Sequence, residues 1–132
     1  MSQLSRGQCL VGKRILVVDD SPDISVIYAR VLQHEGAQVD TASGVLAGMD
    51  LTRQQSYDAV LMDLEMLDIG GLAGVAMLRQ DGYRGLVLAL TGHSEPSIQA
   101  TGMAQGFDGF MAKDGDWAGL IDHISRLISG AC

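Results

Sequence analysis

Short apolar runs alternate with longer stretches in which apolar residues recur every three or four positions. The first short run, Ile15–Val18, is apolar and rich in β-branched residues, which is typical of a strand buried in a sheet. The longer stretches predict helices with one apolar face. The pattern therefore predicts five strand–helix pairs, and the expected strands are Ile15–Val18, Gln38–Ala42, Ala59–Met62, Leu86–Leu90 and Phe107–Ala112.

Capping and breaking residues mark the predicted helices. Ser21 followed by Pro22 predicts a helix start, because proline fits the first helical position, and Ser43 is expected to cap the second helix. The stretch Ser94–Gln105 predicts a weaker helix, because Gly102 interrupts it. The expected apolar faces are Ile24, Ile27, Tyr28, Val31 and Leu32, then Val45, Leu46 and Met49, then Leu72, Val75 and Leu78, and finally Trp117, Leu120, Ile121, Ile124 and Ile128.

The alternation predicts an α/β fold with a doubly wound parallel sheet. Three of the expected strands are almost wholly apolar, which indicates helices on both faces of the sheet. Right-handed crossovers leave few topologies, and the flavodoxin-like order 2-1-3-4-5 with five helices fits this length. We expect one domain over residues 13–129, with residues 1–12 as a lead-in and residues 130–132 as a tail.

Composition excludes several classes of protein. The 132 residues carry 16 acidic and 9 basic side chains, a formal net charge of −7. This balance argues against direct binding to nucleic acid or to an anionic membrane. No apolar run is long enough for a membrane helix, and the first residues lack the apolar centre of a signal peptide.

The cysteines and histidines show no pattern that indicates a metal site. Cys9 and Cys132 lie near opposite ends, and their spacing indicates neither metal binding nor a disulfide framework. A reducing, cytoplasmic location is the simplest interpretation. The histidines His34, His93 and His123 lack ligand spacing, and we expect all of them at the surface.

Polar residues follow the predicted strands where each strand ends. Asp19 and Asp20 follow the first strand, Asp63 the third, Thr91 the fourth and Lys113 the fifth. Because parallel strands end at one edge of a sheet, we expect these side chains to gather beside the switch in strand order. Individually, plainer interpretations remain open: an acidic helix start for Asp20, a helix cap for Thr91 and a solvated side chain for Lys113.

Clustered carboxylates favour a cation and phosphoryl chemistry. Two carboxylates about 4 Å apart repel by roughly 4 kcal/mol at an effective dielectric constant of about 20. Lys113 supplies one positive charge, and hard oxygen ligands suit Mg²⁺. Asp63 is then a candidate nucleophile for an aspartyl phosphate. Mg²⁺ and Lys113 would neutralise the transferring group, and Thr91 would donate its hydroxyl to a phosphate oxygen.

The segments ILVVDDSPD, AVLMDLEM, LALTGH and FMAK resemble the receiver domains of two-component response regulators over about residues 13–129. The resemblance implies that Asp63 is the phosphoacceptor and that Asp19, Asp20 and Asp63 bind Mg²⁺ with the Glu65 backbone carbonyl. It also implies that Thr91 is the switch hydroxyl and that Lys113 contacts the phosphate. Phe110 would be the aromatic residue that turns inward on activation, although a core position also explains it.

This resemblance implies a phosphorelay role. Phosphohistidine on a histidine kinase or phosphotransfer domain would donate to Asp63, and the domain would catalyse its own phosphorylation and dephosphorylation without being a conventional enzyme. A protein effector would bind the face formed by the Ser94–Gln105 helix, the last strand and the last helix. A homodimer stays open, as does the choice between a stand-alone regulator and a segment of a hybrid histidine kinase.

The chain departs from the family pattern at three places. Leu67 stands where the family usually has proline, and Gly70-Gly71 stands where it has Asp-Gly. Asp114 replaces the proline that usually follows the lysine in a cis peptide. Because a cis bond before a non-proline residue costs about 2.5–4 kcal/mol, we expect a trans bond here, or else a strained one.

Other functions were weighed against the receiver interpretation. A phosphatase of the haloacid dehalogenase type also uses a strand-end aspartate, but Glu65 stands where that family has a second aspartate. A receiver-like interaction module that is not phosphorylated is the other alternative, and Asp114 is the best argument for it. A dinucleotide-binding domain is disfavoured, because no glycine-rich loop follows the first strand.

Overall fold

The computed structural model describes residues 9–92 and 95–129, and these residues form the expected alternation of strands and helices. The strands are β1 (Arg14–Val18), β2 (Gln38–Ala42), β3 (Ala59–Asp63), β4 (Leu86–Thr91) and β5 (Gly109–Ala112). The helices are α2 (Pro22–His34), α3 (Val45–Gln54), α4 (Gly71–Gln80), α5 (Pro96–Gln105) and α6 (Trp117–Ser129). Ser94, the expected first residue of the fourth predicted helix, lies outside the described residues.

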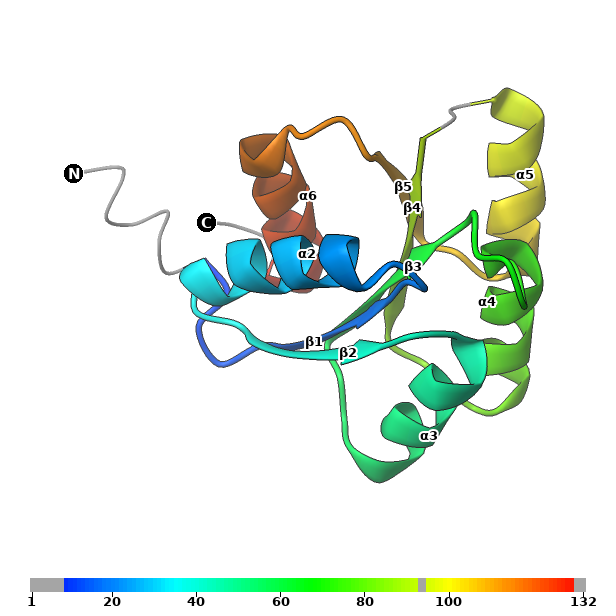
Figure 1. Cartoon of the computed structure of the whole chain (residues 1–132), viewed down its shortest axis with the longest axis horizontal. Helices are drawn as coiled ribbons and strands as arrows, with labels where there is room; N and C mark the ends of the chain where they lie inside the picture. Colours follow the sequence, from blue (N-terminus) through cyan, green and yellow to red (C-terminus); the bar gives the residue numbers. More distant parts are fainter. Residues whose placement is uncertain (1–8, 93–94, 130–132) are drawn as a thin grey trace.

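All strands pair in parallel in the order β2-β1-β3-β4-β5, which confirms the predicted topology. Helices α2 and α6 lie on one face of the sheet, and α3, α4 and α5 lie on the other (Figure 1). A buried apolar cluster fills the space between the sheet and each helical layer. The central strands are therefore covered on both sides, as their continuous apolar sequences predicted.

Two details of the helix predictions are wrong. Gly44, and not Ser43, is the N-cap of α3. Ile27 and Leu46 were expected on apolar faces but are 47% and 59% exposed. Gly48 accounts for the exposure of Leu46. Because Gly48 has no side chain, α3 can approach β1 along the Gly48 face, where an added Cβ would lie 3.1 Å from Val18 Cγ2. The buried face of α3 is therefore turned away from Leu46.

The prediction for Cys9 is also corrected. Cys9 is disulfide-bonded, so the cysteines no longer support a reducing compartment. The other cysteine of the sequence, Cys132, lies outside the described residues. In the part of the chain that the structure describes, no helix combines the length and apolar character needed to span a bilayer.

Arg79 of α4 ties together the edge of the sheet at which the strands begin. Its guanidinium donates hydrogen bonds to the carbonyls of Tyr83, Gly85 and Gly106, at 3.0, 2.7 and 2.9 Å for the Nη atoms. It also pairs with the Asp108 carboxylate at 2.8 Å. A single half-buried side chain thus holds the loops that enter β4 and β5.

Helix α4 begins in close contact with the end of β3. A Cβ added at Gly71 would lie 2.6 Å from the Asp63 carbonyl oxygen and 2.8 Å from Leu64 Cα, both of which are backbone atoms. A Cβ added at the neighbouring Gly70 would meet only the Leu64 carbonyl oxygen, at an ordinary 3.6 Å. Of these two neighbouring glycines, only Gly71 leaves no room for a side chain.

We predict that Gly71→Ser lowers the free energy of unfolding by about 1–3 kcal/mol, because the backbone around Asp63 must move to admit the Cβ. Gly70→Ser is the matched control, since serine is a good N-cap and Gly70 is the N-cap of α4. Urea unfolding of both variants measures the difference. Equal stability of the two variants would contradict the close approach.

Candidate functional site

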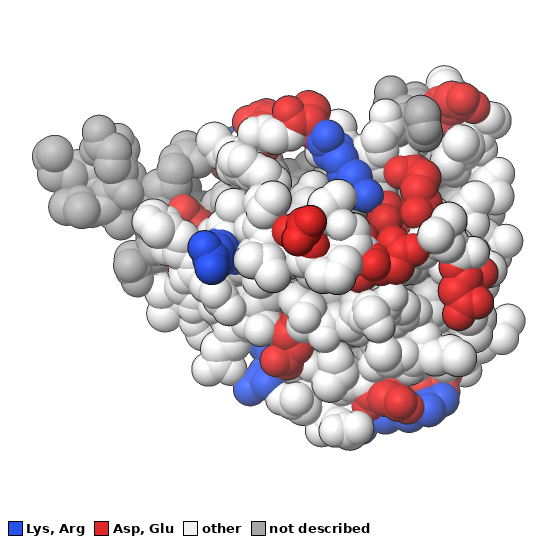
Figure 2. Space-filling view, in the orientation of Figure 1, with Lys and Arg blue, Asp and Glu red and all other residues white. Residues whose placement is uncertain are grey.

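Strand register brings the predicted carboxylates together. Val18 of β1 pairs with Met62 of β3, so the residues that follow, Asp19 and Asp63, meet at the same edge. One carboxylate oxygen from each of Asp19, Asp20 and Asp63 lies within 4.8 Å of the others. Acidic side chains gather on the surface near the ends of β1 and β3 (Figure 2). These three aspartates therefore form one cluster, as the order of the strands predicted.

Thr91 and Lys113 reach the same edge through the pairing of β4 with β5. Thr91 pairs with Ala112, and the Lys113 amide continues the ladder by donating to the Thr91 carbonyl at 2.9 Å. The Lys113 ammonium then donates to Asp63 Oδ1 at 2.7 Å and lies 3.7 Å from Asp19 Oδ2. Lys113 is therefore not a solvated lysine.

The Lys113 ammonium keeps its charge in this setting. Burial alone lowers the pKa of Lys113, but the hydrogen bond to Asp63 and the charges of Asp63, Asp19 and Glu65 raise the pKa above its usual value. One positive charge consequently faces three clustered carboxylates. The cluster retains a surplus of negative charge that favours a further cation.

Asp19 is the member of the cluster whose hydrogen bonding is incomplete. Its side chain is buried, and Oδ1 accepts a hydrogen bond from the Ser21 amide at 2.9 Å. Asp19 Oδ2 is also buried but has no hydrogen-bond partner. Burial raises the pKa of Asp19, the Ser21 hydrogen bond opposes this shift, and the charge of Asp63 adds to it. An orphaned oxygen among hard oxygen ligands fits Mg²⁺.

Asp20 is held by a bond that the family proline would remove. Asp20 is exposed, and its Oδ2 accepts a hydrogen bond from the Leu67 amide at 2.8 Å. Proline has no amide hydrogen, so this contact exists because leucine stands at position 67. The Leu67 side chain itself is 96% exposed.

The Glu65 side chain accepts hydrogen bonds from Thr91 and Gly92, and the sequence interpretation did not predict these contacts. The Thr91 hydroxyl donates to Glu65 Oε2 at 2.9 Å, and the Gly92 amide donates to Oε1 at 3.3 Å. The Glu65 amide also donates to Asp63 Oδ1 at 3.0 Å. An acid two positions after Asp63 was the available signal, but its partner could not be read from spacing. The predicted role of its carbonyl as a metal ligand stays a prediction.

The loop after β5 turns without a cis peptide. Among the described residues there is no cis bond, so the bond between Lys113 and Asp114 is trans, as expected. The Asp114 carboxylate accepts a hydrogen bond from the Asp116 amide at 3.0 Å, and Gly115 adopts a positive φ of 81°. A local side-chain turn thus replaces the proline, and Lys113 still reaches the carboxylates.

Phe110 packs against α5. Its ring is half-buried, and the ring centroid lies 5.5 Å from that of Phe107. A Cβ added at Gly102 of α5 would collide with the tip of the Phe110 ring. The glycine that weakens the predicted helix therefore also makes room for Phe110.

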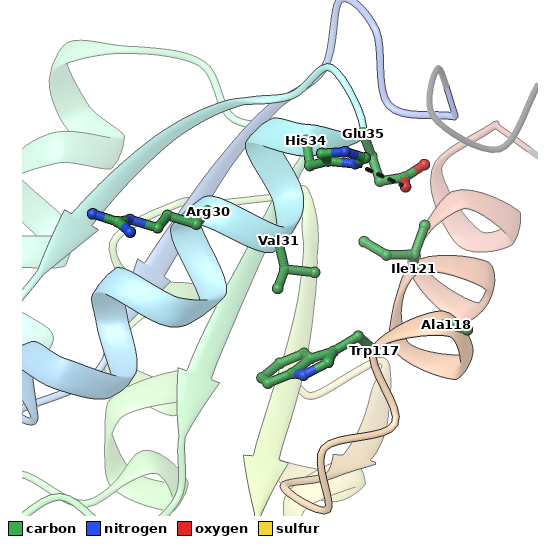
Figure 3. Close-up of a pocket in the computed structure, with 7 residues that line it drawn as sticks. All are labelled: Arg30, Val31, His34, Glu35, Trp117, Ala118 and Ile121. Carbon is green, nitrogen blue, oxygen red and sulfur yellow. Dashed lines mark ion pairs between the residues drawn. The ribbon is translucent and has the colours of Figure 1, made fainter. Parts of the chain in front are cut away.

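A groove of about 380 Å³ lies between α2 and α6, away from the carboxylates (Figure 3). Val31, Trp117 and Ile121 form its apolar part, and none of the clustered aspartates lines it. Trp117 was expected in the core, but it is only half-buried. Its ring packs edge-on against Tyr28, with 5.1 Å between the ring centroids. The groove is therefore not the reactive site.

The histidine predictions hold where they are described. His34 and His123 are exposed, and His93 lies outside the described residues.

Comparison with known proteins identifies the family. The model of the response regulator receiver domain matches residues 15–125. The chain belongs to the response regulator receiver domain family. Receiver domains bind Mg²⁺ at an acidic pocket, and in this chain three aspartates cluster at the corresponding edge of the sheet.

Relatives of this receiver domain include short and long proteins. It is 30% identical over 119 residues to protein PilH of Pseudomonas aeruginosa, covering 89% of this chain and 98% of PilH. It is 33% identical over 116 residues to the transcriptional regulatory protein TcrA of Mycobacterium tuberculosis, covering 88% of this chain and 46% of TcrA. It is 30% identical over 119 residues to the sensor kinase/phosphatase CqsS of Vibrio cholerae, covering 88% of this chain and 17% of CqsS. The chain thus spans less than half of TcrA and CqsS.

Solved receiver structures share the fold. The chemotaxis protein CheY4 of Vibrio cholerae superposes with a TM-score of 0.82 at 25% identity, covering 87% of this chain and 98% of CheY4. The response regulator TrrA of Thermotoga maritima, solved in complex with Mg(2+)-BeF, has a TM-score of 0.78 at 30% identity, covering 87% of this chain and 98% of TrrA.

We predict that Asp19→Asn raises the melting temperature by roughly 3 °C in EDTA, because it removes a buried charge that lacks a full complement of partners. The same variant should lose the rise in melting temperature that Mg²⁺ gives the wild type. Asp23→Asn, in the first turn of α2, is the control and should keep the Mg²⁺ effect. A lower melting temperature for Asp19→Asn in EDTA would show that the Asp19 carboxylate does not destabilise the metal-free fold.

Proposed function

We propose that this receiver domain accepts a phosphoryl group on Asp63 from a phosphohistidine and switches its surface in response. The observation that carries the proposal is the buried Asp63 carboxylate, with the Lys113 ammonium at 2.7 Å and two more carboxylates within 4.8 Å. This arrangement supplies a nucleophile and a fixed positive charge at one point.

In the proposed transfer, an Asp63 oxygen attacks phosphorus as the phosphorus–nitrogen bond to the donor imidazole breaks. The imidazole leaves with the bonding electron pair and takes up a proton, and Asp63 becomes an aspartyl phosphate. Lys113 already donates to Asp63 Oδ1, so it is placed to follow the charge from the carboxylate to the phosphoryl oxygens. Water attack on phosphorus would return Asp63 and release inorganic phosphate.

We propose that Asp19, Asp20, Asp63 and the Glu65 carbonyl would hold Mg²⁺ in this reaction. When bound, Mg²⁺ would neutralise phosphoryl oxygens and orient the incoming group. The unpartnered Asp19 Oδ2 supports this assignment, since it is a buried oxygen without a donor. Asp20 would exchange its Leu67 amide contact for the metal, or keep it on one oxygen and bind through the other.

The switch would connect Thr91 to the α5 side of the molecule. A phosphoryl group adds a charge of about −1.5 to −2 and three acceptor oxygens, and we propose that the Thr91 hydroxyl moves to one of them. Phe110 would then turn further inward, and the face of α5, β5 and α6 would change shape for an effector. Helix α5 suits movement, because Gly102 is its only buried residue.

Receiver domains interact with histidine kinases and with effectors. For this chain we propose a histidine kinase or phosphotransfer domain as donor and a protein effector, with no direct nucleic-acid or membrane partner. A homodimer, a stand-alone regulator and a segment of a hybrid kinase stay open, since PilH is nearly matched in length and CqsS is far longer. We propose a receiver spanning residues 13–129, with residues 1–12 and 130–132 outside it. The cytoplasmic location stays a prediction that the cysteines no longer support.

The deciding experiment is intact-mass measurement after incubation with acetyl phosphate and Mg²⁺. We expect a single phosphate adduct on the wild type and none on Asp63→Asn. Asp68→Asn, which removes an exposed acid from the same loop, should still form the adduct. An adduct that persists in Asp63→Asn would refute the assignment, and failure of the wild type would favour the unphosphorylated module. Turnover of phosphate monoesters would favour the phosphatase.

The position of Phe110 gives a second prediction. The sequence has two phenylalanines, so labelling with 4-fluorophenylalanine gives one ¹⁹F signal each for Phe107 and Phe110. We expect beryllofluoride with Mg²⁺ to shift the Phe110 signal more than the Phe107 signal. Gly102→Ala should displace the Phe110 signal before beryllofluoride is added, because the new Cβ collides with the ring. Unchanged signals in that variant would contradict the contact.

A further inference from the structure

The Glu65 carboxylate holds two donors that stand at the end of β4. Oε2 accepts the hydrogen bond of the Thr91 hydroxyl at 2.9 Å, and Oε1 accepts that of the Gly92 amide at 3.3 Å. Thr91 is only 3% exposed, so its hydroxyl is largely removed from water and needs a protein acceptor. Both oxygens of one carboxylate are therefore engaged with the segment that the proposed switch must move.

The chemistry of these groups makes the contact exclusive. An ionised carboxylate only accepts hydrogen bonds, and a hydroxyl has a single proton to donate. Thr91 can therefore donate to Glu65 or to a phosphoryl oxygen on Asp63, but not to both at once. The Gly92 amide likewise has one hydrogen, which makes a well-aligned hydrogen bond to only one of the two acceptors.

We propose that Glu65 is a positioning residue that holds Thr91 and Gly92 in the unphosphorylated arrangement by competing with the phosphoryl oxygens for their hydrogen bonds. This inference rests on the proposed role of Asp63 as phosphoacceptor. Phosphorylation must break both contacts of Glu65 before the end of β4 can move. The Glu65 carboxylate thus accepts the same Thr91 and Gly92 hydrogen bonds that the phosphoryl group would accept.

The surroundings of Glu65 give it a second, opposing property. The charge of Glu65 is among those that raise the pKa of Lys113, whose ammonium is proposed to contact the phosphate. A phosphoryl group of like charge repels Glu65 and favours its release into solvent, where its exposed side chain has room to move. Glu65 therefore holds Thr91 and Gly92 before phosphorylation, and the phosphoryl group weakens these contacts by repelling the Glu65 carboxylate.

The magnitude of the restraint is set by two competing effects. Hydrogen bonds to a charged acceptor are stronger than neutral ones, whereas solvent screening weakens the contacts of an exposed carboxylate. We expect Glu65→Ala to bind beryllofluoride roughly fivefold more tightly than the wild type in saturating Mg²⁺. Glu65→Gln keeps an acceptor oxygen without the charge and should lie between the two. Isothermal titration calorimetry measures the three dissociation constants.

Simple charge repulsion between Glu65 and the bound anion would also tighten binding in Glu65→Ala, so the test needs a cycle. Thr91→Val removes the hydroxyl and keeps the shape of the side chain. If the restraint acts through the hydroxyl, Glu65→Ala should change the affinity at least threefold less in the Thr91→Val background than in the wild type. An equal change in both backgrounds would overturn the proposal in favour of charge alone.

Asp68→Ala controls for the loss of an acid from the same exposed loop and should leave the beryllofluoride affinity within about twofold of the wild type. If the wild type binds beryllofluoride and Glu65→Ala binds no more tightly, the restraint is refuted and the phosphoacceptor proposal stands. If the wild type forms no adduct with acetyl phosphate and binds no beryllofluoride, the phosphoacceptor proposal falls and the restraint falls with it.

Discussion

The parallel register of β1 with β3 is the constraint on which the site depends. It aligns Val18 with Met62, and every strand direction is the same, so Asp19 and Asp63 must meet where their strands end. The side chains of both strands alternate between the two buried apolar clusters, so packing on both faces of the sheet fixes this register. The two buried apolar layers therefore hold like charges in contact, a position that isolated carboxylates would not adopt.

Holding these charges together has an energetic consequence. Lys113 pairs with Asp63 Oδ1 at 2.7 Å, but its ammonium lies 3.7 Å from Asp19 Oδ2, and this buried oxygen has no hydrogen-bond donor. The apo domain is thus less stable than the same fold with a complete set of partners would be. That deficit gives a cation and a phosphoryl group a differential effect on the fold, and such an effect is required of any ligand that shifts a conformational equilibrium.

The sequence predicts the site better than it predicts the loops around it. Strand ends in a parallel sheet share one edge, so Asp63 and Lys113 could be brought together from the order of the apolar runs alone. The partners of Glu65 and Leu67 could not be predicted, because they depend on the backbone path after β3, where no periodicity operates. The same limit applies to the cap of α3, where Gly44 and not the predicted Ser43 is the N-cap.

The two edges of the sheet differ in a way that suits a switch. Where the strands begin, Arg79 joins loops to α4 through several hydrogen bonds and an ion pair, and each acceptor has its donor. Where they end, Asp19 lacks a donor, and the Thr91 hydroxyl is bonded to an exposed side chain that can leave. Local stability is set by such contacts, so we expect a charge added at Asp63 to move the end of β4 while its beginning stays fixed. Because residues 88–91 of β4 pair with β5, that movement would reach Phe110 and α5.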